Sequence, residues 1–256
     1  MVLATKSLKF FPQFSVSFGS QHNPREDTSS TIFVMDSLLY VMDLYLPVKA
    51  QDPALIAFDS QRNGPTSYSN IRIIALKVRS LGWSQIAYQL AHEMCHFLIP
   101  GTVVPELRWL EESICELSSF FFLPELSKFW KRLDISLTTS DGALYAPQFE
   151  EYALESHADA TVLDLTLFST TSTESELPSL VSDCYQRSKN RYISLRLLPI
   201  FERFPKTWHA IPYLSKVPAQ LSFPDSLAKW IELSPMESRN GLQELALVFG
   251  VTVPLV

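Results

Sequence analysis

Two histidines and a glutamate stand close together in the run His92-Glu93-Met94-Cys95-His96. If this run is helical, His92 and His96 lie four residues apart on one face, and their two imidazoles can hold one Zn²⁺ ion. Glu93 is turned roughly 100° from His92 around the helix, so its carboxylate can reach a water at the metal without ligating the metal. These residue types at this spacing are those of a hydrolytic zinc site.

The apolar residues around the histidines support a helix with two distinct faces. One stripe of the segment is apolar and recurs at helical spacing: Ile86, Leu90, Met94 and Phe97. A different face carries Gln85, Gln89, His92 and His96. The histidines are therefore not simply members of the core stripe, as they would be if they were satisfied interior histidines.

A third ligand is expected on the following helix, predicted over 105–122 with Pro105 at its first position. Glu112 and Glu116 lie four residues apart there, nearly opposite an apolar stripe. One carboxylate can bind the metal while the other accepts a hydrogen bond from a ligating imidazole. A solvated acidic face is the alternative interpretation of this pair. Glu111 and Glu106 are the alternative ligands if the register of the helix differs.

The two segments together resemble the gluzincin zinc metallopeptidases, the group that contains thermolysin and the M1-type aminopeptidases. The resemblance covers about 71–120 and rests on His92–His96 and on the run from Trp109 to Glu116. It implies Glu112 as the third zinc ligand and Glu116 as the acid that faces His92. Glu111 replaces an asparagine that is frequent in those families, and the spacing from His96 to Glu112 is shorter than theirs.

The resemblance also implies how substrate is held and where negative charge is stabilised. In zincins a strand before the zinc-binding helix forms the upper edge of the cleft, which assigns substrate binding to Ala75 and Leu76 in the strand 71–78. In gluzincins a Tyr or His from the helical C-terminal part stabilises the oxyanion. We expect Tyr192 in this role, and the other candidates are Tyr185, His157 and His209, with Arg191 as a cationic helper.

These residues need a scaffold, and hydrophobic periodicity predicts one of class α+β. In the N-terminal part we expect one or two strands within 1–30, a helix over 31–46, strands over 54–58 and 71–78 with a polar turn between them, and a helix over 83–98. After residue 123 we expect helices over 125–133, about 149–168 and about 178–203. The predicted architecture is zincin-like: one domain, 1–256, with a strand-containing lobe to about residue 100 and a helical lobe over 101–256.

Composition excludes several other classes of protein. The chain has 256 residues, 46% of them hydrophobic and 19% charged, which is typical of a globular protein. Its net charge of −6 does not favour nucleic acid, and only 7 glycines argue against a glycine-rich phosphate loop. Three cysteines are no disulfide framework, and no apolar run is long enough for a membrane helix or a signal peptide. We expect a cytoplasmic protein.

The expected function is that of a zinc metallopeptidase, a hydrolase that binds one Zn²⁺ per chain at His92, His96 and Glu112. Glu93 is expected to act as general base on a peptide or protein substrate. Two alternatives stay open: a catalytically silent zincin fold used as a binding module, and a toxin-like protease that acts on one protein target. Cys95 is expected to be a small buried residue rather than a nucleophile or a ligand. The oligomeric state is left open.

Overall fold

A computed structural model describes residues 5–19, 27–78, 82–133, 142–170 and 172–253 of the chain. The strands are β1 (Thr5–Ser7), β2 (Phe14–Ser17), β3 (Ala54–Phe58), β4 (Thr66–Tyr68) and β5 (Ile73–Leu76). The α-helices are α1 (Ser29–Asp43), α2 (Trp83–Leu98), α3 (Arg108–Arg132), α4 (Gly142–Glu155), α5 (Leu177–Ser182), α6 (Arg187–Arg203), α7 (Phe223–Leu233) and α8 (Met236–Val248). The predicted class, α+β with a small sheet, is confirmed.

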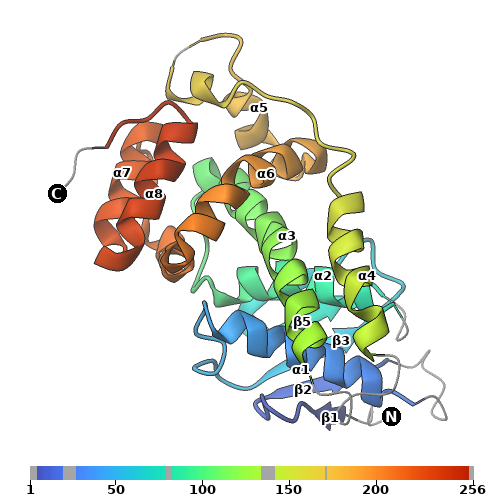
Figure 1. The fold of residues 1–256 in the computed structure, drawn as a ribbon. Coiled ribbons are helices and arrows are strands. Elements are labelled where there is room, and N and C mark those ends of the chain that lie inside the picture. The colour runs from blue at the N-terminus through green and yellow to red at the C-terminus, as the bar shows by residue number, and fades with distance from the viewer. Residues whose placement is uncertain (1–4, 20–26, 79–81, 134–141, 171, 254–256) are drawn as a thin grey trace. The chain divides into compact units, whose positions relative to one another are not determined.

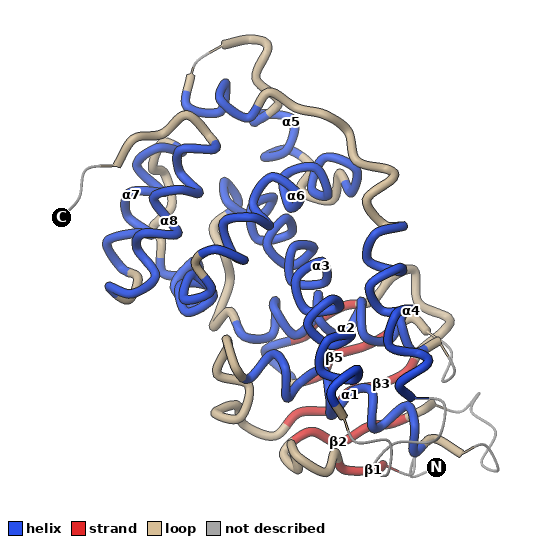
Figure 2. The backbone as a smooth tube through the Cα atoms, in the orientation of Figure 1, coloured by secondary structure: helices blue, strands red, loops and turns tan. Residues whose placement is uncertain are grey.

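The five strands form one mixed sheet in the order β1-β2-β3-β5-β4 (Figure 2). The three central strands, β2, β3 and β5, run parallel to one another, whereas β1 and β4 pair antiparallel at the two ends of the sheet. Helix α1 connects β2 to β3, as a parallel pair requires, because parallel neighbours need a long crossover. The predicted strands 54–58 and 71–78 correspond to β3 and β5, and β4 falls in the predicted polar turn.

One face of this sheet forms the core of the N-terminal part. Val16, Ile56 and Ile74, one from each parallel strand, lie side by side in the register and are fully buried. Helix α2 packs on β4 and β5, and α1 packs on α2 (Figure 1). The sheet therefore fixes the helix that carries His92 and His96.

The predicted helix over 83–98 agrees with α2 in both of its ends. Its C-terminus is followed by Pro100 and by Gly101, whose φ of +88° is a conformation that other residues adopt only under strain. A 3₁₀ turn, η2, then begins at Pro105 and leads into α3. Proline at the start of a helix loses no backbone hydrogen bond there, which is why this position was predictable.

Helix α3 is longer than predicted, because it continues through Pro124 to Arg132. The separate helix predicted over 125–133 is therefore wrong. Leu126 is fully buried and Trp130 is 3% exposed, so packing beyond the proline outweighs the hydrogen bond that the proline removes. As a result α3 is one continuous helix from Glu112 to the buried residues of its C-terminal half.

Two further predicted helices have different bounds from those expected. The helix expected over 149–168 is α4, which ends at Glu155, and a separate 3₁₀ turn, η4 (Leu165–Ser169), follows. The Asp164 carboxylate accepts hydrogen bonds from Thr166, which favours this turn over a continued helix. The helix expected over 178–203 is divided into α5 and α6, since Asn190 Nδ2 donates to the carbonyl oxygen of Cys184 at 2.7 Å and holds a turn there.

The chain divides into two compact units. The first unit contains 1–98 and 118–156, and the second contains 99–117 and 157–256. The core of the second unit is aromatic: Trp109 packs against Phe168, Phe223 and Phe249. The 3₁₀ segment η5 (Pro205–Lys216) packs against α7 and α8 in this unit. Among the described residues, no helix combines the length and apolar character that crossing a membrane requires.

Candidate metal centre

Helix α2 presents its two histidines beside each other. The imidazole rings of His92 and His96 have centroids 5.1 Å apart and planes inclined by 61°, and both side chains are half-buried. The apolar stripe of the same helix is buried at Ile86, Leu90 and Met94, each with no exposed surface. The predicted separation of the two faces is confirmed, so the hydrophobic core holds the helix while the imidazoles stay accessible.

Helix α3 is fixed against α2 by two buried hydroxyl groups. Ser118 Oγ donates to the carbonyl oxygen of Ala91 at 2.8 Å, and Ser119 Oγ donates to that of Tyr88 at 2.8 Å. Glu112 precedes Ser118 by six residues on the same continuous helix, which is ~9 Å along its axis. These hydrogen bonds therefore join α3 to α2 within the first of the two units.

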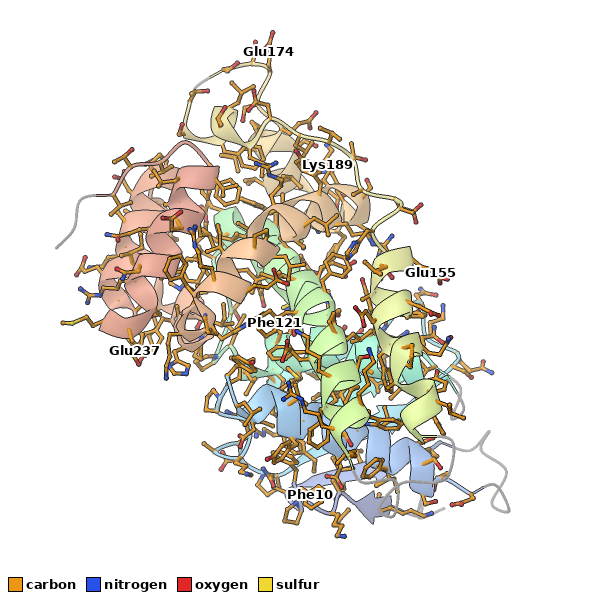
Figure 3. All side chains as sticks on the ribbon, in the orientation of Figure 1. Phe10, Phe121, Glu155, Glu174, Lys189 and Glu237 are labelled. Atoms are coloured by element: carbon orange, nitrogen blue, oxygen red, sulfur yellow. The ribbon has the colours of Figure 1, made fainter. Side chains whose placement is uncertain are left out.

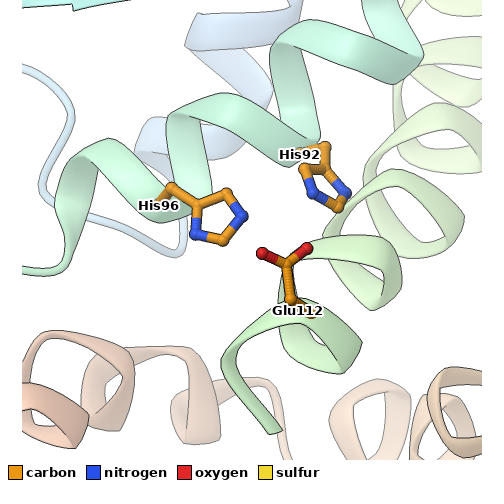
Figure 4. A group of neighbouring side chains, drawn as sticks. All are labelled: His92, His96 and Glu112. Atoms are coloured by element: carbon orange, nitrogen blue, oxygen red, sulfur yellow. The ribbon is translucent and has the colours of Figure 1, made fainter. Parts of the chain in front are cut away.

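His92, His96 and Glu112 form the group that has metal-ligand chemistry (Figure 4). Each offers one ligand atom, these atoms all lie within 4.8 Å of one another, and all three residues are half-buried. In a tetrahedral zinc site the ligand atoms are ~3.4 Å apart, because each lies ~2.1 Å from the metal. Rotamer adjustments of about 1 Å would bring the three donors to that separation, so the donor set is compatible with zinc.

Glu93 lies on the same helix and is 4% exposed, which is rare for a carboxylate side chain. It does not belong to the group of three, and its role as general base stays a prediction. Cys95 and Cys115 are fully buried, and Cys184 is half-buried. The prediction that Cys95 is a packed core residue is confirmed.

Glu116 is bound by an arginine from α6 within the second unit. Arg191 Nε donates to Glu116 Oε1 at 2.9 Å, and the side chains are 12% and 4% exposed. The same guanidinium reaches Asp159 Oδ2 at 3.1 Å, although Asp159 is 80% exposed. Arg191 was expected as a cationic helper near the oxyanion, and the structure places its guanidinium on the acid that was predicted to face His92.

The four candidates for the oxyanion donor lie in different environments. His157 is half-buried near Glu116 and Arg191, and its pKa is lowered from 6.5 by burial and by the Arg191 charge, against a raising effect of Glu116. Its imidazole is therefore neutral at neutral pH. The remaining candidates are Tyr192, Tyr185 and His209.

Tyr192 lines an open pocket of about 370 Å³ in the second unit, whose walls include Val162, Leu165 and Val248. Tyr185 is 75% exposed. The imidazole of His209 contacts Glu237 of α8 at 3.3 Å, a residue labelled in Figure 3. The role predicted for Tyr192 stays a prediction.

The strand predicted to form the substrate edge is not an edge of the sheet. Ala75 in β5 pairs with Ala57 of β3 on one side and with Thr66 of β4 on the other, and Leu76 is fully buried. The prediction that this strand forms an edge is therefore wrong, because Ala75 has a neighbouring strand on both sides and offers no free edge to an extended peptide. The outer strand on this side is β4. It has only three residues, all polar or aromatic, so it lacks the apolar alternation by which a strand is recognised in a sequence.

Gln89 lies on the histidine face of α2, and the partner of its side chain could not be predicted from the sequence. Its Oε1 accepts from the backbone N–H of Lys77 at 2.8 Å, and its Nε2 donates to the carbonyl oxygen of Lys77 at 3.2 Å. One glutamine on α2 thus binds both backbone groups of the residue that follows β5.

No family model, curated protein or solved structure matches this chain. Evidence on function therefore comes from the residues of the chain, above all from the group of His92, His96 and Glu112.

Proposed function

We propose that this protein is a zinc-dependent peptidase of the gluzincin type with a zincin-like fold. The observation that carries the proposal is the convergence of His92 and His96 from α2 with Glu112 from α3, with their ligand atoms within 4.8 Å of one another. Three protein ligands with one open position are typical of catalytic zinc sites, whereas structural zinc sites use four. A sequence with only three cysteines also favours a cytoplasmic location.

In this proposal each residue of the chain has one task. His92, His96 and Glu112 hold the metal, and Glu116 keeps an imidazole oriented through its carboxylate. Zinc, when bound, supplies Lewis-acid polarisation of the scissile carbonyl and acidifies a water molecule. Glu93 takes a proton from that water and returns it to the leaving amine, which is general acid–base catalysis by one carboxylate. Tyr192 or His157 donates a hydrogen bond to the developing oxyanion.

The substrate in this proposal is a peptide in extended conformation. The outer strand β4 ends the described sheet next to β5, and an unpaired strand edge binds an extended backbone by adding one more strand. Main-chain hydrogen bonds of this kind give affinity with little demand on the substrate sequence. We assign substrate binding to the backbone of Thr66, Ser67 and Tyr68.

The test of the proposed function is a comparison of zinc content with peptide hydrolysis. Wild-type protein is expected to bind about one zinc per chain, and alanine at His92, His96 or Glu112 is expected to lose both metal and activity. Glu93→Gln is expected to keep zinc and to lose roughly 10²- to 10⁴-fold in kcat. Tyr192→Phe compared with His157→Gln then identifies the oxyanion donor.

Two results contradict the proposal in different ways. Full activity of Glu93→Gln would exclude the assigned base. Zinc binding by the wild type without any peptidase activity would favour the alternative function, a zincin fold that binds a partner and does not hydrolyse it.

A further inference from the structure

The backbone of Lys77 is held by a side chain of the helix that carries the histidines. The two hydrogen bonds of Gln89, 2.8 Å from the Lys77 N–H and 3.2 Å to the Lys77 carbonyl oxygen, are the pair that a neighbouring strand would make. A glutamine amide is suited to this task, because it has one acceptor and one donor group in a single plane. Gln89 therefore extends the pairing of the sheet beyond the end of β5.

The contact continues from Lys77 to the segment that leads into β4. Lys77 Nζ donates to the carbonyl oxygen of Asn63 at 3.1 Å, and β4 begins three residues later at Thr66. Thr66 in turn pairs with Ala75 of β5. Gln89, Lys77 and Asn63, which we call the edge clamp, thus connect α2 to the end of the β4–β5 pair at which β4 begins and β5 ends.

Gln89 lies on the same stripe of α2 as the candidate ligands. His92 follows it by three residues and His96 by seven, so all three side chains project from one face of the helix. The face that presents the imidazoles is therefore the face that is tied to Lys77. Gln85 shares this stripe, is exposed, and makes no hydrogen bond among the described residues.

We propose that Gln89 is a positioning residue which, through the edge clamp, fixes the distance between the outer strand β4 and the histidine face of α2. This inference rests on the proposed function, since it assumes that β4 holds an extended peptide while Glu93 and the metal act on one of its bonds. Misplacement of a bound substrate by about 1 Å can cost 10²-fold in rate, so a fixed spacing favours long peptides that span both elements. Substrates too short to reach β4 gain nothing from the clamp.

The test uses Gln89→Met, which keeps the length of the side chain and removes both hydrogen bonds, with Gln85→Met as the matched control. The substrates are an extended fluorogenic peptide and an aminoacyl amide that is too short to lie on β4. Gln89→Met is expected to lower kcat/KM about tenfold on the extended peptide, mainly through kcat, and less than about twofold on the short substrate. Gln85→Met is expected to leave both values unchanged, and zinc content is expected to be the same in all three proteins.

A second readout does not depend on activity. Hydrogen exchange of the Lys77 amide in zinc-free protein is expected to be about tenfold faster in Gln89→Met than in wild type or Gln85→Met. Gln89→Glu, which keeps the acceptor and loses the donor, is expected to give intermediate exchange and intermediate loss on the extended peptide. It also provides the test if Gln89→Met does not fold.

The possible outcomes separate the two proposals. Equal losses of kcat/KM on both substrates, or no loss on either, would overturn the role of Gln89 in an active peptidase. Unchanged Lys77 exchange would overturn the clamp itself. Lack of hydrolysis by wild type together with faster Lys77 exchange in Gln89→Met would refute the peptidase function, and with it the substrate role of the clamp, while leaving the contact established.

Discussion

The hydroxyl group of Ser118 on α3 donates a 2.8 Å hydrogen bond to the carbonyl oxygen of Ala91 on α2, one residue before His92. The neighbouring Ser119 makes the same kind of bond, at 2.8 Å, to the carbonyl oxygen of Tyr88. Carbonyls in the interior of a helix already accept from the backbone, and their second lone pair serves the serines. The two candidate ligand helices are thus joined by polar groups that are fully buried.

Replacing these serines should weaken the metal site without touching a ligand. We expect Ser118→Ala and Ser119→Ala each to cost about 1 kcal/mol of unfolding free energy, because each removes one buried hydrogen bond. The double variant should also bind zinc more weakly than wild type, since Glu112 is carried by the same helix. Urea unfolding and zinc titration measure the two effects. Unaltered zinc affinity in the double variant would show that α3 is held in place by its apolar contacts alone.

The buried pair of Arg191 and Glu116 allows a prediction with an internal control. Arg191→Met leaves Glu116, 4% exposed, without its cation, and loss of one partner of a buried pair typically costs about 3–5 kcal/mol. Asp159→Asn removes the other contact of Arg191, but Asp159 is 80% exposed and its loss should cost at most about 1 kcal/mol. Urea denaturation at neutral pH compares the two variants. Similar losses of unfolding free energy in the two variants would mean that the buried ion pair stabilises the fold no more than the exposed contact does.

The elements of the site were predictable where the pattern is local. Helix α2 was predicted with both ends because its apolar residues recur at helical spacing and because Pro100 and Gly101 follow it. The two histidines lie within that one helix, so their juxtaposition follows from helical geometry alone. The choice of Glu112 over Glu111 and Glu106 followed from the resemblance to the gluzincins, because helical spacing alone does not select one acidic residue of the next helix.

The parts that were not predictable depend on contacts between distant segments. Gln89 and Lys77 are 12 positions apart and meet only because β5 and α2 pack together, and Arg191 and Glu116 are 75 positions apart. β4 consists of three residues without an apolar alternation, so it gives no strand pattern and the edge was assigned to β5 instead. Pro124 predicts a helix end on local grounds, whereas burial of Leu126 and Trp130 keeps the helix continuous.

Zinc should stabilise the folded protein, and the variants that weaken this effect identify the third ligand. A ligand that binds only the folded state adds about 2.7 kcal/mol at a free concentration 100 times its Kd. We therefore expect a rise in Tm when zinc is added to chelator-treated wild type, and a much smaller rise in Glu112→Ala. Glu111→Ala and Glu106→Ala, the alternative ligands, should respond like wild type. If zinc raised the Tm of Glu112→Ala as in wild type but did not raise the Tm of Glu111→Ala, Glu111 would be the third ligand.

Asp36 gives a prediction about pH that is independent of the metal site. Its side chain on α1 is 2% exposed, and its carboxylate accepts hydrogen bonds from the backbone N–H groups of Lys9 at 2.7 Å and Phe10 at 3.1 Å. Burial nevertheless raises the pKa of Asp36 above 3.8, against the lowering effect of these N–H groups. The folded protein therefore holds this proton more tightly than the unfolded chain does. The contribution of Asp36 to stability is largest at low pH, and it falls as the pH rises from 3.8 through the folded pKa. Above the folded pKa it is constant.

Asp36→Asn removes this titration and replaces one acceptor by a donor that faces a backbone N–H. The variant should be less stable than wild type by about 1–3 kcal/mol, because a buried N–H loses its partner. The difference should be larger near pH 4 than at about pH 7, since acid stabilises only the protein that carries Asp36. Urea unfolding of both proteins over this range gives the two curves. A difference that grows toward neutral pH would mean that the hydrogen bonds to the ionised carboxylate outweigh its burial.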